Sequence, residues 1–189
     1  MVKKVLVPVA DGSEEMETVV VVDVLRRAGA EVTLAAVIEG VASGGLDVTC
    51  SRGVRLVADK PLTSCRDECW DLIVLPGGLP GAEHLRDSRT LAAILRAHAA
   101  AGRPYAAICA APGCVLAAHG LLEGHRATAH PSFMAPLPRP SEERVVVDGG
   151  VVTSRGPGTA LEFALALVGV LYGDGKRREV ARQMLAPEA

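Results

Sequence analysis

Short apolar segments alternate with segments of helical periodicity along this chain of 189 residues, and this alternation limits the folds open to it. The clearest apolar segments cover residues 3–10, 31–37, 71–75 and 105–109. Strands that are apolar on both faces and separated by helices are typical of a parallel sheet covered by helices. The sequence therefore predicts an α/β fold with one mainly parallel sheet, and we expect a single domain spanning residues 1–189.

The other predicted elements fit between these strands. The first helix contains the run 18–22, whose residues favour strands, but the spacing of its apolar residues favours a helix that Ser13 caps. A short strand is predicted at 126–129, and Gly149-Gly150 is typical of a hairpin turn. Helices are predicted at 14–28, 88–101, 114–119, 159–172 and 176–185, and hairpins at 47–58 and 144–154.

Composition excludes several classes of function. The formal net charge is −2 and aromatic residues make up 3% of the chain, whereas nucleic-acid binding calls for a cationic surface and stacking rings. No apolar run is long enough to span a membrane. The five cysteines are odd in number, and we expect free thiols in the cytoplasm. Cys65 and Cys69 lack a matching pair of ligands elsewhere, so no metal site is expected.

The segment 105–113 suggests a reactive site. An apolar strand ends at Cys109, small residues and Pro112 follow, and a helical pattern begins at about Cys114. This strand–turn–helix layout resembles the elbow that exposes a nucleophile in hydrolases, and the helix start favours a thiolate. Cysteine is also among the most frequently buried residue types, so a structural cysteine is the alternative.

Polar or small residues follow several predicted strands, where the carboxyl ends of parallel strands form ligand sites. They are Glu14-Glu15-Met16-Glu17 after the first strand, Gly77-Gly78 after 71–75, Cys109, and His130 after 126–129. Each also has a purely structural interpretation: a solvated helix start, a tight turn, or a hydrogen-bonded loop histidine. Their shared place at one sheet edge favours a common site.

Four motifs, in this order, resemble those of the DJ-1/ThiJ/PfpI superfamily and most closely its DJ-1 branch. The match runs from the first strand to the last helix. The motifs are Asp11-Gly12-Ser13-Glu14-Glu15-Met16-Glu17, Leu75-Pro76-Gly77-Gly78, Ala106-Ala107-Ile108-Cys109-Ala110-Ala111-Pro112 and Thr153-Ser154-Arg155-Gly156-Pro157-Gly158-Thr159.

The resemblance implies a flavodoxin-like three-layer sandwich with a nucleophile-elbow cysteine, and a homodimer. It implies that Cys109 is the reactive cysteine, Glu17 its partner carboxylate and His130 a companion histidine. It places substrate and oxyanion binding at Gly77, Gly78 and Ala110, with the N–H groups of Gly78 and Ala110 as donors. It also implies a dimer-side pocket containing Arg27 and Arg52, with Cys50 nearby.

Two departures from related branches narrow the activity that the resemblance implies. The protease-like branch has a histidine directly after its cysteine, where this chain has Ala110. Amidotransferase relatives have a His-x-Glu pair, where this chain has His130-Pro131-Ser132. The implied activity is therefore a cofactor-independent glyoxalase or deglycase that acts on α-oxoaldehydes such as methylglyoxal.

A Glu17–Cys109 pair in hydrogen-bond contact should hold one negative charge, because two anions oppose each other's ionisation. We expect a protonated Glu17 beside a Cys109 thiolate of lowered pKa. Such a thiolate suits addition to an aldehyde. It also suits oxidation by peroxide to a sulfinate, so a redox-sensing stress chaperone is the alternative. A binding scaffold that catalyses no reaction is the third hypothesis for this protein.

Overall fold

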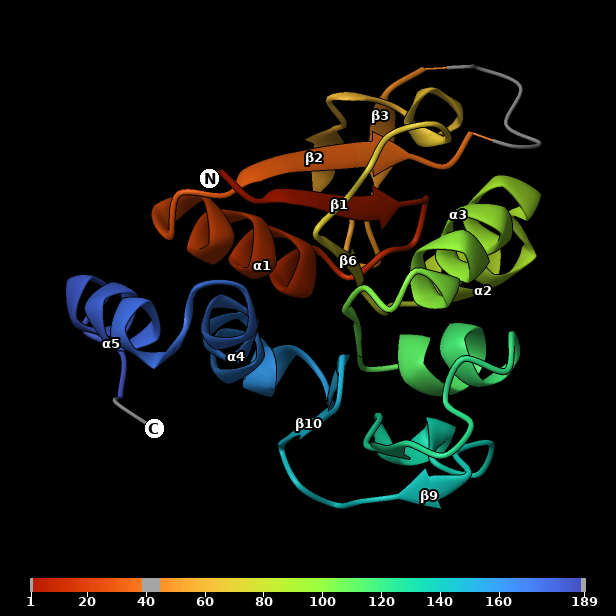
Figure 1. Ribbon diagram of the computed structural model, residues 1–189. Coiled ribbons are helices and arrows are strands. Elements are labelled where there is room, and N and C mark those ends of the chain that lie inside the picture. Colours follow the sequence, from red (N-terminus) through yellow and green to blue (C-terminus); the bar gives the residue numbers. More distant parts are fainter. Residues whose placement is uncertain (1, 39–44, 188–189) are drawn as a thin grey trace.

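The computed structural model describes residues 2–38 and 45–187, and its centre is a seven-stranded sheet (Figure 1). The strands lie in the order β10–β11–β7–β6–β1–β2–β5, and every neighbouring pair is parallel except β10 and β11. This confirms the predicted mainly parallel α/β architecture. The strands are β1 (Lys4–Val9), β2 (Glu31–Ala36), β5 (Lys60–Pro61), β6 (Leu72–Leu75), β7 (Tyr105–Ile108), β10 (Val145–Asp148) and β11 (Val151–Ser154).

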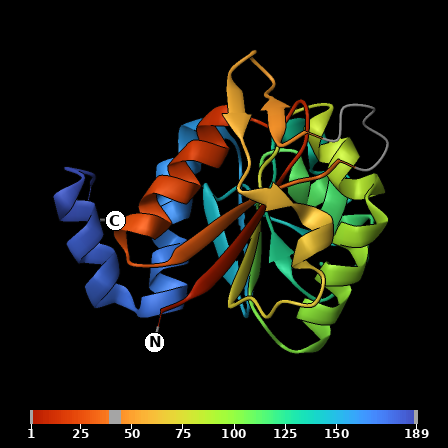
Figure 2. The same cartoon turned by 90° about the horizontal axis from the view of Figure 1, so that it is seen from above.

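Helices cover both faces of the sheet and make a three-layer sandwich (Figures 1 and 2). One face carries α1 (Glu15–Arg27) and α4 (Ala160–Tyr172), with α5 (Asp174–Gln183) packed against α4. The other carries α2 (Gly81–Asp87), α3 (Arg89–Ala100) and the π-helical turn η2 (Pro112–Ala117). No helix in the described part of the chain is long and apolar enough to cross a membrane.

Two apolar cores separate the layers, as the alternation of side chains along a strand requires. In β1, Val5 and Val7 contribute to the core beneath α1 and α4, whereas Leu6 contributes to the core beneath α2 and α3. Both faces of β1 are therefore buried. This explains why the strand is apolar throughout instead of alternating with polar residues.

Helix α1 forms despite its run of β-branched residues. Val21, Val24 and Leu25 are buried on one side of the helix and belong to the same core as Phe163 of α4. The burial of this apolar stripe outweighs the modest strand preference of valine, because tertiary packing supplies most of the stability of a helix in a protein. The predicted helix is thus confirmed.

Two small sheets lie outside the central one. β3 (Asp47–Thr49) and β4 (Arg55–Val57) form the predicted antiparallel hairpin. β8 (Arg126–Ala127) is shorter than the predicted strand and pairs with β9 (Arg139–Pro140), so it is not part of the central sheet. The short helical turns are η1 (Leu62–Cys65), η3 (Pro131–Phe133) and η4 (Pro157–Thr159).

Two local predictions were wrong, and one helix was missed. Ser13 does not cap α1, because its Oγ accepts a hydrogen bond from the N–H of Ala10 at 3.0 Å and closes the preceding loop. A separate helix, α2, precedes α3 and was not predicted. The helix after Cys109 begins at Pro112, two residues earlier than expected, and is a single π-helical turn.

Candidate active site

Cys109 lies at the end of β7 in a left-handed backbone conformation, with φ of 65°. Such a value is uncommon for a residue with a side chain, and surrounding contacts must hold it. Here the Cys109 N–H donates to Ser154 O at 2.9 Å, and its carbonyl accepts from the His130 N–H at 2.8 Å. The backbone is thereby fixed on both sides, and the half-buried thiol is held at the sheet edge.

Glu17 reaches the same edge from the first turns of α1. Its side chain is fully buried, and Oε2 accepts a hydrogen bond from the Gly77 N–H at 2.7 Å. Within the described residues, Oε1 is buried without a geometric hydrogen-bond partner. An unpaired buried acceptor is costly, and a proton on Glu17 would let its carboxyl group donate to the Cys109 side chain, with which it hydrogen-bonds.

Electrostatics couple these two side chains. Burial raises the pKa of Glu17 to about 7, while hydrogen bonds to Gly77 and to the Cys109 side chain oppose that rise. Burial and the charge of Glu17 raise the pKa of the Cys109 thiol to about 12. The expected lowering of the Cys109 pKa is therefore wrong, because burial beside a carboxylate outweighs the effect of the short turn η2.

Two backbone donors hydrogen-bond the side chain of Cys109. The N–H groups of Gly78 and Ala110 both hydrogen-bond Cys109 and favour its thiolate form. When the shared proton resides on Glu17, the repulsion between two anions disappears and these donors remain. Transfer of the shared proton from Cys109 to Glu17 would therefore leave a neutral carboxyl group beside a thiolate that these donors stabilise, with the net charge of the pair unchanged at −1.

Close packing explains the glycines of the Pro76-Gly77-Gly78 turn. A Cβ on Gly77 would lie 2.6 Å from the Cys109 Cβ and 3.0 Å from Glu17 Oε2. Gly78 has φ of 85°, and a Cβ there would lie 2.4 Å from Gly12 O. Only glycine lets this turn approach Cys109 and Glu17 so closely.

An open pocket of about 270 Å³ leads to the thiol. Its walls combine the elbow with the β3–β4 turn and the segment after β8, so His130 and Arg52 both face the space that contains Cys109. Its lining residues are Glu14, Ser51, Arg52, Gly78, Leu79, Cys109, Ala110, His130, Phe133 and Pro157. His130 is exposed, and its Nδ1 accepts from the Ser132 N–H at 3.3 Å, so a neutral ring carries its proton on Nε2.

A buried acidic network supports one wall and was not predicted from the sequence. Ser51 Oγ donates to Glu14 Oε2 at 2.6 Å and lies 2.9 Å from Glu15 Oε2. The Arg52 N–H donates to Glu15 Oε1 at 2.9 Å. These bonds attach the β3–β4 turn to the start of α1. The consecutive glutamates were the available signal, but nothing in the sequence indicated their partner.

Arg27 is not brought to this pocket. It is exposed at the far end of α1, where its Nε pairs with Asp23 at 2.7 Å. Of the two arginines predicted for a dimer-side pocket, only Arg52 lines the space around Cys109. No group of three or more His, Cys, Asp or Glu side chains that could hold a metal ion occurs within the described ranges.

Cys109, His130, Gly78 and Ala110 thus line one pocket, and the buried Glu17 carboxyl group hydrogen-bonds the cysteine at its wall. A profile of the DJ-1/PfpI family matches residues 3–169. The chain belongs to the DJ-1/PfpI family. The DJ-1 structure from Toxoplasma gondii, described as oxidized, is 48% identical with a TM-score of 0.93 and covers 97% of this chain and 98% of that one. This family has the predicted flavodoxin-like fold.

Two relatives differ in length and in what their names state. Protein DJ-1 homolog B of Arabidopsis thaliana is 49% identical over 96% of this chain but only 41% of its own length, so this chain spans less than half of that relative. A protein of Caenorhabditis elegans, named glutathione-independent glyoxalase DJR-1.2, is 34% identical over 95% of this chain and 94% of its own.

Proposed function

We propose that this protein is a cofactor-independent glyoxalase that converts methylglyoxal-like α-oxoaldehydes to 2-hydroxy acids, with deglycase-type repair as a related activity. The observation that carries the proposal is the buried Glu17 carboxyl group beside Cys109, with backbone N–H groups directed at the sulfur. The name of the Caenorhabditis elegans relative supports the same chemistry.

The first step is addition to the aldehyde. Cys109 Sγ bonds to the aldehyde carbon and its proton moves to Glu17, while the carbonyl oxygen takes the electron pair. Glu17 then passes that proton to the oxygen and is a carboxylate again. In this proposal the N–H groups of Gly78 and Ala110, which hydrogen-bond Cys109, stabilise the negative charge that moves from the sulfur to this oxygen. The product is a hemithioacetal, and no oxidant enters.

The second step moves hydrogen within the substrate. Glu17 removes the proton from the former aldehyde carbon and returns one to the neighbouring carbon, and the hydroxyl proton on the first carbon moves to the oxygen of the second. The first carbon is thereby oxidised while the second is reduced. Water then hydrolyses the resulting thioester and releases the 2-hydroxy acid and the Cys109 thiol. His130 lines the same pocket, and we assign it to the activation of this water.

Turnover of methylglyoxal, measured as lactate formed, tests this proposal. Wild-type protein should form lactate without glutathione, and Cys109→Ser should lose at least about a hundredfold in rate, because a hydroxyl is a far weaker nucleophile. The control is Cys69→Ser, which removes an exposed thiol outside the pocket and should retain the wild-type rate. Full turnover by Cys109→Ser would overturn the proposal.

The second candidate is a redox-sensing stress chaperone in which Cys109 is oxidised to a sulfinate. The observation in its favour is the donor set around a half-buried, pocket-facing sulfur, which would also hold sulfinate oxygens. The oxidized state named for the Toxoplasma gondii relative agrees with it. Mild peroxide should add two oxygen atoms to wild-type protein and none to Cys109→Ser, as measured by intact mass. Oxidation of a wild-type protein that forms no lactate from methylglyoxal would favour the redox-sensing role over the glyoxalase.

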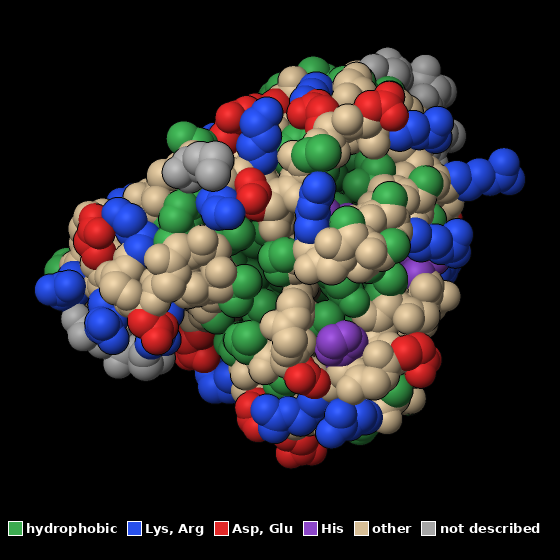
Figure 3. Space-filling model, in the orientation of Figure 1, with side chains coloured by type: hydrophobic (Ala, Val, Ile, Leu, Met, Phe, Trp, Pro, Cys, Tyr) green, Lys and Arg blue, Asp and Glu red, His purple; other side chains and the backbone are tan. Residues whose placement is uncertain are grey.

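We further propose that two copies form a homodimer through α1 and the β3–β4 hairpin. Apolar side chains are unusually exposed there, with Met16 at 57% and Val57 at 69%, and Val19 and Val54 are also exposed. Figure 3 shows hydrophobic side chains gathered at the centre of one face, over α1 and α4.

All five cysteines are free, which agrees with the cytoplasmic location that we propose.

A further inference from the structure

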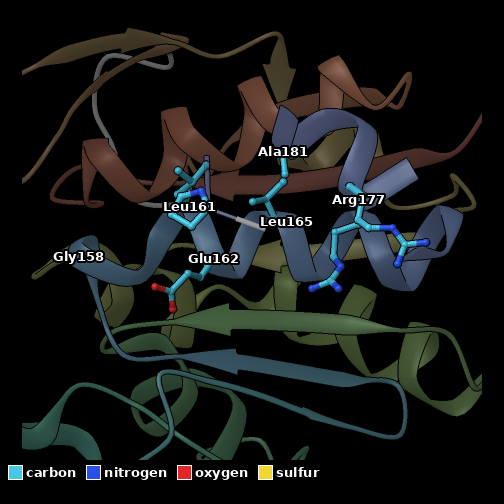
Figure 4. A pocket seen from close by; sticks show the side chains of 8 residues that line it. Gly158, Leu161, Glu162, Leu165, Arg177 and Ala181 are labelled. Carbon is cyan, nitrogen blue, oxygen red and sulfur yellow. The ribbon is translucent and has the colours of Figure 1, made fainter. Parts of the chain in front are cut away.

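A second pocket lies between α4 and α5, outside the Cys109 site (Figure 4). Its volume is about 240 Å³, below the roughly 300 Å³ at which pockets for drug-sized ligands begin. No residue lines both pockets. The lining residues are Gly158, Leu161, Glu162, Leu165, Arg177, Arg178, Ala181 and Pro187.

The connection between the two helices creates this space. Gly173, with φ of 84°, joins them directly, so α5 turns back along α4. Leu161 and Leu165 lie one turn apart on α4 and face the pocket, whereas α5 contributes the small Ala181. Short side chains opposite long ones leave an apolar floor that the protein itself does not fill.

The charge around this floor is unbalanced. Glu162 is already neutralised, because its carboxylate accepts hydrogen bonds of 2.9 and 3.1 Å from Arg144 Nε. Arg178 has no side-chain partner within residues 2–38 and 45–187. The pocket therefore combines apolar walls with unneutralised positive charge.

Arg177, the second arginine, is held only loosely. Its Nε lies 3.1 Å from the exposed Asp174 Oδ1, but this contact does not meet hydrogen-bond geometry and leaves the Nε–H without a partner among the described residues. In Figure 4, Arg177 and Gly158 lie at opposite ends of the row of labelled residues. A ligand along this row would have its polar end at the arginine side.

The geometry points to a binding site for a short- or medium-chain fatty acid, with its chain on Leu161, Leu165 and Ala181 and its carboxylate at Arg177 and Arg178. Guanidinium groups match carboxylates in shape and charge, and the apolar floor matches an alkyl chain. This site is independent of the reaction proposed at Cys109.

Isothermal titration calorimetry with butanoate, hexanoate and octanoate tests the chain. Affinity should increase about threefold to fourfold per methylene group while the pocket still has room, because each buried methylene contributes a similar free energy. Hexylamine has the same chain and the opposite charge, and it should bind at least about tenfold more weakly than hexanoate. Cys109→Ser and Arg52→Gln should bind hexanoate like wild type, which distinguishes this pocket from the Cys109 site.

Substitutions test the two ends of the site. Arg178→Gln, at an exposed position, should weaken hexanoate binding about tenfold or more, as expected for loss of a charge-assisted hydrogen bond. Arg96→Gln, on α3, is the matched control and should have no effect. Leu161→Trp should block binding, whereas Val170→Trp, at an exposed position of α4 outside the pocket, should not.

Three outcomes would overturn the inference. They are the absence of saturable hexanoate binding, equal binding of hexylamine, and unchanged hexanoate affinity in Arg178→Gln. Each can be obtained with protein that forms lactate normally, so failure of this inference and failure of the glyoxalase proposal can be told apart.

Discussion

Gly77 shows how strongly one residue position constrains this site. Its missing side chain leaves the space in which Cys109 and Glu17 meet, since a Cβ would lie 2.6 Å from the Cys109 Cβ. The contacting atoms belong to a rigid elbow and a buried carboxyl group, so neither can move away easily. The residue therefore sets the geometry of the site although it carries no reactive group.

Gly77→Ala should consequently lower methylglyoxal turnover at least about tenfold and destabilise the protein by about 1–3 kcal/mol, because overpacking forces the neighbours apart. Lactate formation and urea unfolding measure the two effects. The control is Gly150→Ala, whose Cβ would have ordinary contacts from 3.5 Å outwards and should cost less than about 1 kcal/mol. Wild-type turnover in Gly77→Ala would contradict this account of the turn.

The buried Glu17 should also make stability depend on pH. Burial raises its pKa from 4.5 to about 7, so its neutral form is favoured in the folded protein. The stability that this provides is fully present below pH 4.5 and is lost as pH rises through about 7. The loss amounts to roughly 3 kcal/mol, since one pKa unit corresponds to about 1.4 kcal/mol.

Urea unfolding at pH 4.5 and pH 8 measures this dependence. Glu17→Gln keeps the neutral shape and cannot ionise, so its stability should fall less over this range than that of wild type. Glu123→Gln removes an exposed carboxyl group and serves as the matched control. Identical pH profiles for wild type and Glu17→Gln would show that the pKa of Glu17 is the same in the folded and the unfolded protein, and would contradict its elevation by burial.

At the scale of elements, α1 depends on α4. The β-branched run of α1 is helical because its buried stripe shares a core with α4, in which Phe163 is fully buried. Glu17 stands on this helix, so the packing of α1 against α4 also sets the position of the carboxyl group relative to Cys109. Stability and site geometry are coupled through this helix pair.

Phe163→Ala should lower the free energy of unfolding by about 3–5 kcal/mol, the usual cost of a large cavity in a core. Urea unfolding measures it. Val170→Ala changes a partly exposed residue of the same helix and should cost less than about 1 kcal/mol. Equal effects of the two substitutions would show that α4 is not anchored through Phe163.

At the scale of the whole molecule, the exposed apolar side chains of α1 and the β3–β4 hairpin are the surface that we assign to a second copy. Met16→Asp with Val57→Asp should convert the proposed dimer to a monomer, because charges would be buried at the interface without partners. Sedimentation velocity measures the mass. Val147→Asp, at a similarly exposed valine of β10, is the control. A monomeric wild type would contradict the proposal.

Sequence periodicity was sufficient for the strands of the central sheet because they are apolar on both faces and flanked by helices. The short strand predicted at 126–129 is present as β8, but periodicity did not indicate its partner, because the paired segment Arg139–Pro140 carries no strand pattern. Periodicity also missed α2, whose seven residues are too few to show a clear helical period. Short elements are specified by their neighbours and not by their own residues.

The sequence alone determined the α/β architecture, the elbow at Cys109 and the family, because all three depend on local patterns and ordered motifs. Only the tertiary structure decided how Glu17 and Cys109 share a charge, since their pKa values follow from burial and from backbone donors supplied by other segments. It also decided which arginine lines the same pocket as the thiol. Arg52 does so because Ser51 and Glu15 hold its turn there, whereas Arg27, on the same helix as Glu17, pairs with Asp23 outside the pocket. Spacing along a chain cannot encode such distances, because they arise only when separate elements pack together.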